Sequence, residues 1–102
     1  VIIATGSKPT VLPFIQQDKE RIITSTEALN LREVPKHMIV IGGGVIGLEM
    51  ASVYARLGVR ISVVEFLDSL VPSMDRAIGK ELQRVLGKIG VKFYLSHKVT
   101  GA

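Results

Sequence analysis

From residue 38 onward, apolar runs alternate with amphipathic stretches. Residues 38–41 are continuously apolar, the pattern of a parallel strand that is covered on both faces. The glycine-rich residues 42–47 predict a turn, and a helix is expected to follow as far as about Leu57, with Gly58 as its left-handed cap. The apolar face of this helix is predicted to consist of Met50, Val53, Tyr54 and Leu57.

A second strand is expected at residues 60–65, where Ile61 and Val63 are apolar and β-branched. We expect Ser73 to cap the next helix, with Asp75 in its first turn near the positive end of the helix dipole. An apolar stripe on that helix is formed by Ile78, Leu82, Val85, Leu86 and Ile89, and Gly90 ends it. Residues 91–95 are predicted to form a third strand.

This order, β-α-β-α-β with short connections, predicts an α/β fold. Right-handed crossovers would place the three strands in one parallel sheet, in the spatial order third, second, first, with helices packed on it. The unit is therefore expected to be a partial Rossmann fold of the FAD/NAD(P)-binding type. The first and third strands would form the two edges of this sheet.

The first third of the chain is less regular. Residues 1–4 are apolar and predict a buried strand, whereas the prolines and polar residues of 7–20 predict an irregular connection. Thr24 and Glu27 have the spacing of a capping box, which predicts a short helix through residues 28–30. We expect residues 1–6 to end one domain, 7–37 to connect, and 38–102 to form a truncated βαβαβ unit of a longer protein.

Composition narrows the function classes. A chain of 102 residues suits one small domain with a single core. Its formal net charge of +4 comes from positive residues that are scattered along the chain. One solvated helix face is expected to carry Lys80, Arg84 and Lys88. We therefore do not expect nucleic-acid binding. No apolar run approaches the ~20 residues of a membrane span, so a membrane protein is not expected. There is no cysteine, which excludes a disulfide, a thiolate metal site or a cysteine nucleophile inside this chain.

Residues 42–47 read G-G-G-V-I-G and fit the pattern G-x-G-x-x-G between a predicted strand and a predicted helix. In that context Gly42 permits the tight turn, Gly44 lets a pyrophosphate approach the backbone, and Gly47 lets the helix pack closely on the strand. The free N–H groups at the helix start would bind the phosphates. The pattern therefore predicts a dinucleotide site.

Two carboxylates accompany this turn. Glu65 follows the second strand, where it can accept hydrogen bonds from both adenosine ribose hydroxyls and would repel a 2′-phosphate, which favours NAD over NADP. Phe66 and Leu67 come next, where an NADP site would carry an arginine. Glu49 lies early on the first helix of the unit, where two interpretations stay open: stabilisation by the helix dipole, or a contact with the nicotinamide end of the cofactor.

Three stretches together resemble the pyridine nucleotide–disulfide oxidoreductase family, and within it the members that oxidise dihydrolipoamide. They are the strand ending in A-T-G at residues 4–6, the stretch G-G-G-V-I-G-L-E at residues 42–49, and V-V-E-F-L at residues 63–67. The resemblance extends over essentially the whole chain and implies a homodimeric FAD-dependent parent that reduces NAD⁺ through a redox disulfide and serves 2-oxo acid dehydrogenase complexes. That disulfide would lie outside this chain, which has no cysteine.

The resemblance also implies the role of each site residue. Contacts to FAD would come from Ala4, Thr5 and Gly6. Contacts to the NAD pyrophosphate and ribose would come from Gly42, Gly43, Gly44, Val45, Ile46, Gly47, Leu48 and Glu49. Glu65 would bind the adenosine ribose, Val99 would border the adenine, and Glu49 would lie near the nicotinamide. No catalytic residue and no metal ligand is expected here, since His37 and His97 lack the context of the family's catalytic histidine.

Alternatives from other classes stay open. The parent could be another NADH-linked flavoprotein reductase or a non-catalytic NAD-binding module. A cytoplasmic location is expected, or the mitochondrial matrix if the source is eukaryotic. We expect no turnover from the chain alone.

Overall fold

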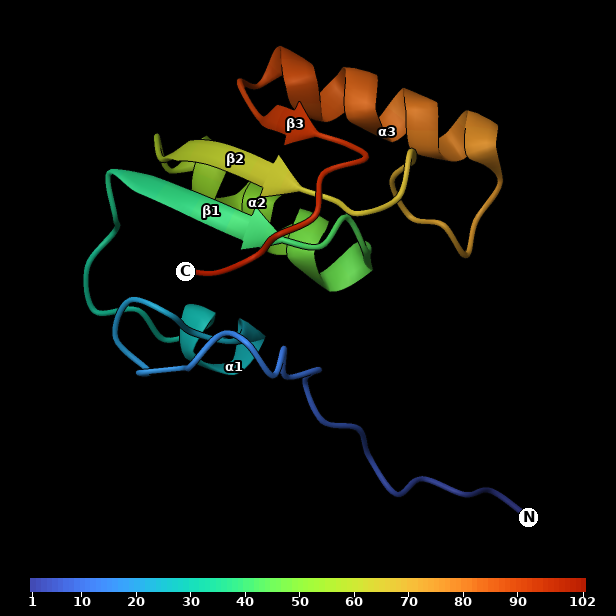
Figure 1. Ribbon diagram of the computed structural model, residues 1–102. Helices are drawn as coiled ribbons and strands as arrows, with labels where there is room; N and C mark the ends of the chain where they lie inside the picture. Colours follow the sequence, from blue (N-terminus) through green and yellow to red (C-terminus); the bar gives the residue numbers. More distant parts are fainter.

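The computed structural model describes residues 1–102 and contains three helices and three strands. In chain order they are α1 (Ser25–Ala28), β1 (His37–Ile41), α2 (Val45–Arg56), β2 (Arg60–Val64), α3 (Arg76–Lys88) and β3 (Lys92–Tyr94). The strands form one parallel sheet in the order β1-β2-β3 (Figure 1). This confirms the predicted α/β fold and strand order, and β1 and β3 are the two edges.

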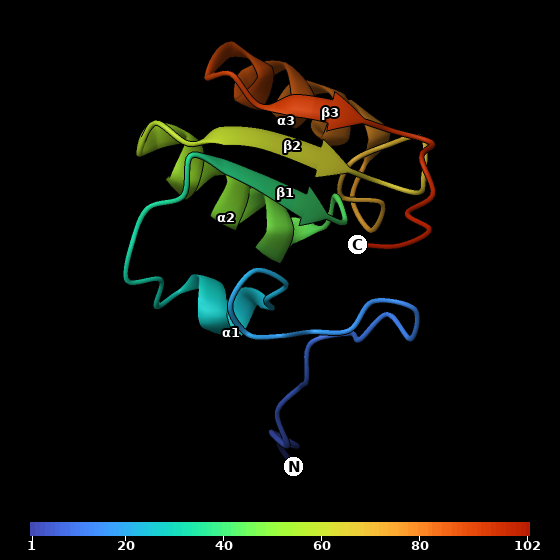
Figure 2. The ribbon, with the colours of Figure 1, turned by 60° about the vertical axis from the view of Figure 1, so that its left-hand side comes forward.

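Both long helices lie against the same face of the sheet (Figure 2). Ile61 and Val63 of β2 have no exposed surface, and α2 contributes Ala51 and Tyr54 to the same core. On β1 the side chains alternate between exposed and half-buried, so Ile39 keeps 62% of its surface exposed. The expectation that this strand is covered on both faces is therefore wrong for this chain, because no element packs on the second face.

The ends of the helices follow local chemistry. Gly58 with φ +87° follows α2, and Gly90 with φ +94° follows α3, as left-handed caps that an L side chain would strain. The predicted cap Ser73 is wrong: Asp75 caps α3, and its carboxylate accepts a hydrogen bond of 2.7 Å from the Ala77 amide. Because α3 begins at Arg76, the residue directly before the helix is Asp75, and Ser73 lies two residues too early to cap it.

The buried faces of the helices differ in part from the predicted stripes. On α2 the buried side consists of Leu48, Ala51 and Tyr54, whereas Val53 and Leu57 are exposed. On α3 the buried residues are Gly79 and Leu86. The remaining residues of the predicted α3 stripe divide into half-buried Leu82 and Ile89 and exposed Ile78 and Val85. Helical spacing identified apolar positions, but the sheet covers only part of each stripe.

The capping box predicted for α1 is confirmed. The Thr24 hydroxyl accepts from the Thr26 amide, and the Glu27 carboxylate accepts from the Thr24 amide at 2.8 Å. The helix ends at Ala28, two residues earlier than predicted. The Ala28 carbonyl accepts a hydrogen bond of 2.5 Å from the buried hydroxyl of Tyr54, and this bond joins α1 to α2.

Residues 1–4 were predicted as a buried strand, and this is wrong for the chain as it stands. Residues 1–10 belong to no helix or strand and are all exposed, and in both ribbon views they extend away from the sheet. A strand requires a neighbour for its N–H and C=O groups, and none of the three strands pairs with this segment.

Candidate functional site at the glycine turn

The glycine turn lies where β1 ends and α2 begins, at the carboxyl edge of the sheet (Figure 1). Gly42 has φ +107°, in the left-handed region, and its amide donates to the carbonyl of Val64 at 2.8 Å. This bond ties the turn to the end of β2. Glycine is required at residue 42 because other residues are strained at that φ.

Gly47 is restricted by space. A Cβ placed on it would lie 2.8 Å from the carbonyl oxygen of Gly42 and 3.1 Å from Cγ1 of Val40. The first distance is shorter than Cβ contacts allow and the second is tight, so the first turn of α2 can approach β1 this closely only with glycine here. The predicted close packing of helix and strand is confirmed.

Gly44 is the N-cap of α2, and nothing in the chain lies within 4 Å of the place where its Cβ would be. No side chain caps the helix. The amides of Gly44, Val45, Ile46 and Gly47 donate to no other group of the chain. Together with the helix dipole, these free donors form an open position suited to an anionic group such as a phosphate.

Gly43 is buried, and both its N–H and its C=O group are hydrogen-bonded. Its amide donates to Oε2 of Glu65 at 2.5 Å, and its carbonyl accepts from the Val71 amide at 2.8 Å. A Cβ on Gly43 would lie 2.7 Å from Cδ2 of Leu70. The turn is therefore held by β2 and by the loop between β2 and α3.

Glu65 comes directly after β2, and only 9% of its surface is exposed. Its Oε1 accepts from the Leu67 amide at 2.7 Å, while Oε2 accepts from Gly43. No arginine or lysine pairs with it. The structure thus brings Glu65 against the glycine turn, as the predicted site requires.

Sequence analysis missed the contacts made by Leu70 and Val71. Both residues are 2% exposed, and Val71 has φ +42°, an unusual conformation for a β-branched residue. They lie in an irregular loop without periodic spacing, so the sequence offers only their apolar character, which does not indicate where the loop packs.

The other predicted site residues are more scattered. Glu49 is exposed on α2, one residue past the first helical turn, where a dipole effect has largely decayed. Val99 is half-buried in the segment that follows β3. Ala4, Thr5 and Gly6 are exposed in the N-terminal segment and are not brought to the glycine turn (Figure 1).

The loop after Glu65 contains one ion pair. The guanidinium of Arg76 donates to the Asp68 carboxylate at 2.6 Å and holds the pKa of that carboxyl below its usual value. Both side chains are largely exposed. The pair joins the loop after β2 to the first residue of α3.

The two histidines make local contacts only. Nδ1 of His37 lies 3.4 Å from the Arg60 guanidinium, and its Nε2 lies 3.1 Å from the Ser62 hydroxyl. The ring of His97 bonds the Leu95 carbonyl at 2.7 Å. No group of three or more His, Cys, Asp or Glu side chains is placed to hold a metal ion.

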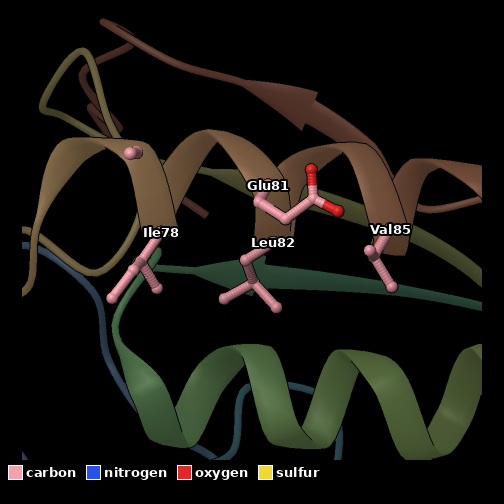
Figure 3. A pocket seen from close by; sticks show the side chains of 5 residues that line it. Ile78, Glu81, Leu82 and Val85 are labelled. Atoms are coloured by element: carbon pink, nitrogen blue, oxygen red, sulfur yellow. The ribbon is translucent and has the colours of Figure 1, made fainter.

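A shallow hollow lies on α3, away from the glycine turn. Figure 3 shows Ile78, Leu82 and Val85 pointing to the side of α3 that faces α2, whereas Glu81 points away from it. Its lining is almost entirely apolar and offers no donors for phosphate groups. No helix of the chain combines the length and the apolar character that crossing a membrane requires.

The site combines a strand, a glycine turn and a helix N-terminus with free amides, and a buried carboxylate lies beside them. These are the elements of a dinucleotide-binding unit. A family model described as pyridine nucleotide-disulphide oxidoreductase matches residues 1–102. The chain belongs to the pyridine nucleotide-disulphide oxidoreductase family.

Individual relatives are similar over the same length. The chain is 53% identical over 102 residues to dihydrolipoyl dehydrogenase 3 of Pseudomonas putida, covering 100% of this chain and 22% of that relative. It is 52% identical over 101 residues to leghemoglobin reductase of Vigna unguiculata, covering 99% of this chain and 19% of that relative. The crystal structure of LpdA from Mycobacterium tuberculosis matches with a TM-score of 0.83 and 34% identity, over 95% of this chain and 21% of that one. The chain thus spans about a fifth of the length of these relatives.

Proposed function

We propose that this chain is the NAD-binding segment of a dihydrolipoyl dehydrogenase. The observation that carries the proposal is the open position above Gly44, where four backbone amides have no acceptor, next to the buried carboxylate of Glu65. A diphosphate requires donors without a competing side chain, and a ribose requires an acceptor for its hydroxyls. The residues present therefore fit a dinucleotide.

In this proposal the amides of residues 44–47 bind the pyrophosphate, and Glu65 accepts the adenosine ribose hydroxyls. Val99 borders the adenine, and Glu49 orders the nicotinamide end. The Glu49 carboxylate is exposed and lies past the first turn of α2, where a ligand can reach it. Ala4, Thr5 and Gly6 would contact FAD in the full protein.

The choice of NAD over NADP follows from charge. A 2′-phosphate would lie against the Glu65 carboxylate, and Arg76 is already paired with Asp68. We test this by calorimetric titration of the chain with NADH and with NADPH. NADH is expected to bind more tightly, and Glu65→Arg should weaken NADH by about tenfold or more, since charge-assisted hydrogen bonds are lost. Glu33→Arg makes the same charge change at an exposed position outside the site and should leave binding unchanged. Failure of the unaltered chain to bind NADH would contradict the proposal.

The reaction of the whole protein is part of the proposal. When bound, FAD supplies the electron carrier between a dithiol substrate and NAD⁺. This chain contributes binding and orientation, and since it has no cysteine it cannot supply a redox disulfide. We therefore expect no turnover from the chain alone. In the full-length parent, dihydrolipoamide should bleach the flavin absorbance and NAD⁺ should restore it.

A second candidate is a different NADH-linked flavoprotein reductase. It is favoured by one observation, the 52% identity to a protein named leghemoglobin reductase, which nearly equals the identity to the dihydrolipoyl dehydrogenase. A flavin that is reduced by NADH and not by dihydrolipoamide would support this candidate. A full-length parent without any flavin spectrum would instead support a non-catalytic NAD-binding module.

The remaining partners and the location are inferred from the same similarity. We propose a homodimer that associates with 2-oxo acid dehydrogenase complexes, in the cytoplasm or the mitochondrial matrix. Co-purification of the full-length parent with such a complex would test the association.

A further inference from the structure

Gly43 occupies a position that the pattern G-x-G-x-x-G leaves variable. Its N–H, its C=O and the place of its missing Cβ are nevertheless all in contact with other residues. Its amide is bonded to Glu65, its carbonyl to the Val71 amide, and its missing side chain would meet Leu70. Gly44, directly after it, begins the run of free amides. The Gly43 N–H fixes the peptide before this residue, and the Gly43 carbonyl fixes the peptide that carries the Gly44 amide, so the bonds at Gly43 restrict where the free amides begin.

Glu65 uses both of its carboxylate oxygens on backbone amides. Oε2 accepts from Gly43 at 2.5 Å and Oε1 accepts from Leu67 at 2.7 Å. Each oxygen has a second lone pair, so the carboxylate can still accept from a ligand hydroxyl. A buried carboxylate without a cationic partner is stabilised by such amide bonds, and the bond to Gly43 joins it to the turn across 22 residues of sequence.

We propose that Glu65 is a positioning residue for the phosphate-binding turn, in addition to its predicted role as a ribose ligand. Through the Gly43 amide it holds the free amides of residues 44–47 in the orientation that binds a diphosphate. The ribose and diphosphate subsites are then coupled by one side chain. This inference rests on the proposed function and adds to it a role that does not require ribose hydroxyls.

The conservative substitution Glu65→Gln separates the two roles. A glutamine has one oxygen and one NH₂ group, while Gly43 and Leu67 both present N–H donors to residue 65. Whichever way the side-chain amide is turned, its NH₂ group faces one backbone donor. The substitution therefore breaks one of the two amide bonds, either the one to Gly43 or the one to Leu67, while it retains size and some capacity to bond a ribose hydroxyl.

The test uses two ligands, ADP and 2′,3′-dideoxy-ADP, which has the same diphosphate but no ribose hydroxyls. Calorimetric titrations compare the unaltered chain with Glu65→Gln, and circular dichroism melts verify folding. If the positioning role is correct, Glu65→Gln weakens dideoxy-ADP by about tenfold, the effect of one lost hydrogen bond to a charged group. If Glu65 serves only the ribose, dideoxy-ADP binds as tightly to Glu65→Gln and to Gly43→Ala as to the unaltered chain, and the positioning role is overturned.

A second variant perturbs the same bond and keeps the carboxylate. In Gly43→Ala the new Cβ would lie 3.1 Å from Oε2 of Glu65 and 2.7 Å from Cδ2 of Leu70, so both side chains must shift and the bond to Glu65 is expected to weaken. Dideoxy-ADP binding should fall again. Gly87→Ala is the matched control, because nothing lies within 4 Å of its Cβ and it is on the exposed side of α3.

A measurement on the unaltered chain covers the case in which either variant fails to fold. Amide hydrogen exchange by NMR should show the Gly43 amide protected and the amides of residues 44–47 exchanging more rapidly. Equal exchange at Gly43 would mean that the bond to Glu65 is absent, and the inference would be wrong. If the unaltered chain binds neither ADP nor NADH, the proposed function fails instead, and the two failures are thus distinguishable.

Discussion

Replacing Gly47 by alanine tests whether the approach of α2 to β1 depends on the absence of a single methyl group. The added Cβ would lie 2.8 Å from the Gly42 carbonyl oxygen and 3.1 Å from Cγ1 of Val40. The first of these atoms is backbone and belongs to the turn itself, so it cannot rotate away as the end of a long side chain would. The helix must shift relative to the strand.

The expected cost follows from two opposing effects. Forcing a methyl group into a packed region costs about 1–3 kcal/mol. Alanine is favoured over glycine inside a helix by about 0.5–1 kcal/mol, and less at the third residue of α2 than in its middle. The net destabilisation is therefore about 1 kcal/mol, which lowers Tm by roughly 4–8 °C in a domain of this size.

Thermal melts followed by circular dichroism measure this change, with Gly87→Ala as the control. Gly87 lies in α3 with no atom within 4 Å of its Cβ, so that variant gains the helix preference of alanine without a steric cost and should melt above the unaltered chain. The two glycines differ in surroundings, and the two variants should shift Tm in opposite directions. If Gly47→Ala melts as high as Gly87→Ala, the steric argument for this glycine is refuted.

Three further predictions rest on other parts of the structure. Gly44→Ala should change Tm by only a few degrees because its Cβ meets no atom of the chain, yet it should weaken NADH binding about tenfold or more in calorimetric titration by occupying the diphosphate position. Tyr54→Phe removes the buried hydrogen bond to the Ala28 carbonyl and should cost about 1–2 kcal/mol in urea unfolding. The Asp18 carboxylate accepts hydrogen bonds from the backbone amides of Ile22, Glu20 and Arg21, which lower its pKa from the usual 3.8. The stabilisation is therefore complete above that pH and is lost as the pH falls through the lower folded-state pKa. Acid unfolding of Asp18→Asn should lack this pH-dependent component.

The sheet and the turn were predictable because their determinants are local. A run of apolar residues ending at Ile41, then Gly42, Gly44 and Gly47, specifies strand, turn and helix within a dozen residues. Each glycine answers a requirement of the backbone next to it. Likewise the capping box of Thr24 and Glu27 involves only three residues of separation, and the structure contains it.

The errors arose where the outcome depends on distant parts of the chain. Residues 1–4 have the composition of a buried strand, but a strand forms only beside another, and no neighbour pairs with them. Val53 and Leu57 lie at helical spacing, yet they are exposed because the sheet covers another side of α2. The contact of Leu70 with the turn could not be predicted at all, since it depends on how the irregular loop after β2 folds back.

These distant contacts change how the glycine pattern should be understood. Gly42 and Gly47 are required by backbone conformation and by packing within the turn itself, so any unit with the same turn would require them. Gly43 is different: its need for a small residue comes from Leu70 and Glu65, which belong to other elements. A position that the local pattern leaves variable is therefore restricted to a small residue by buried side chains from another part of the chain. The specificity of the turn is therefore shared between the pattern and the loop that covers it, and substitutions at Leu70 should alter what residue 43 tolerates.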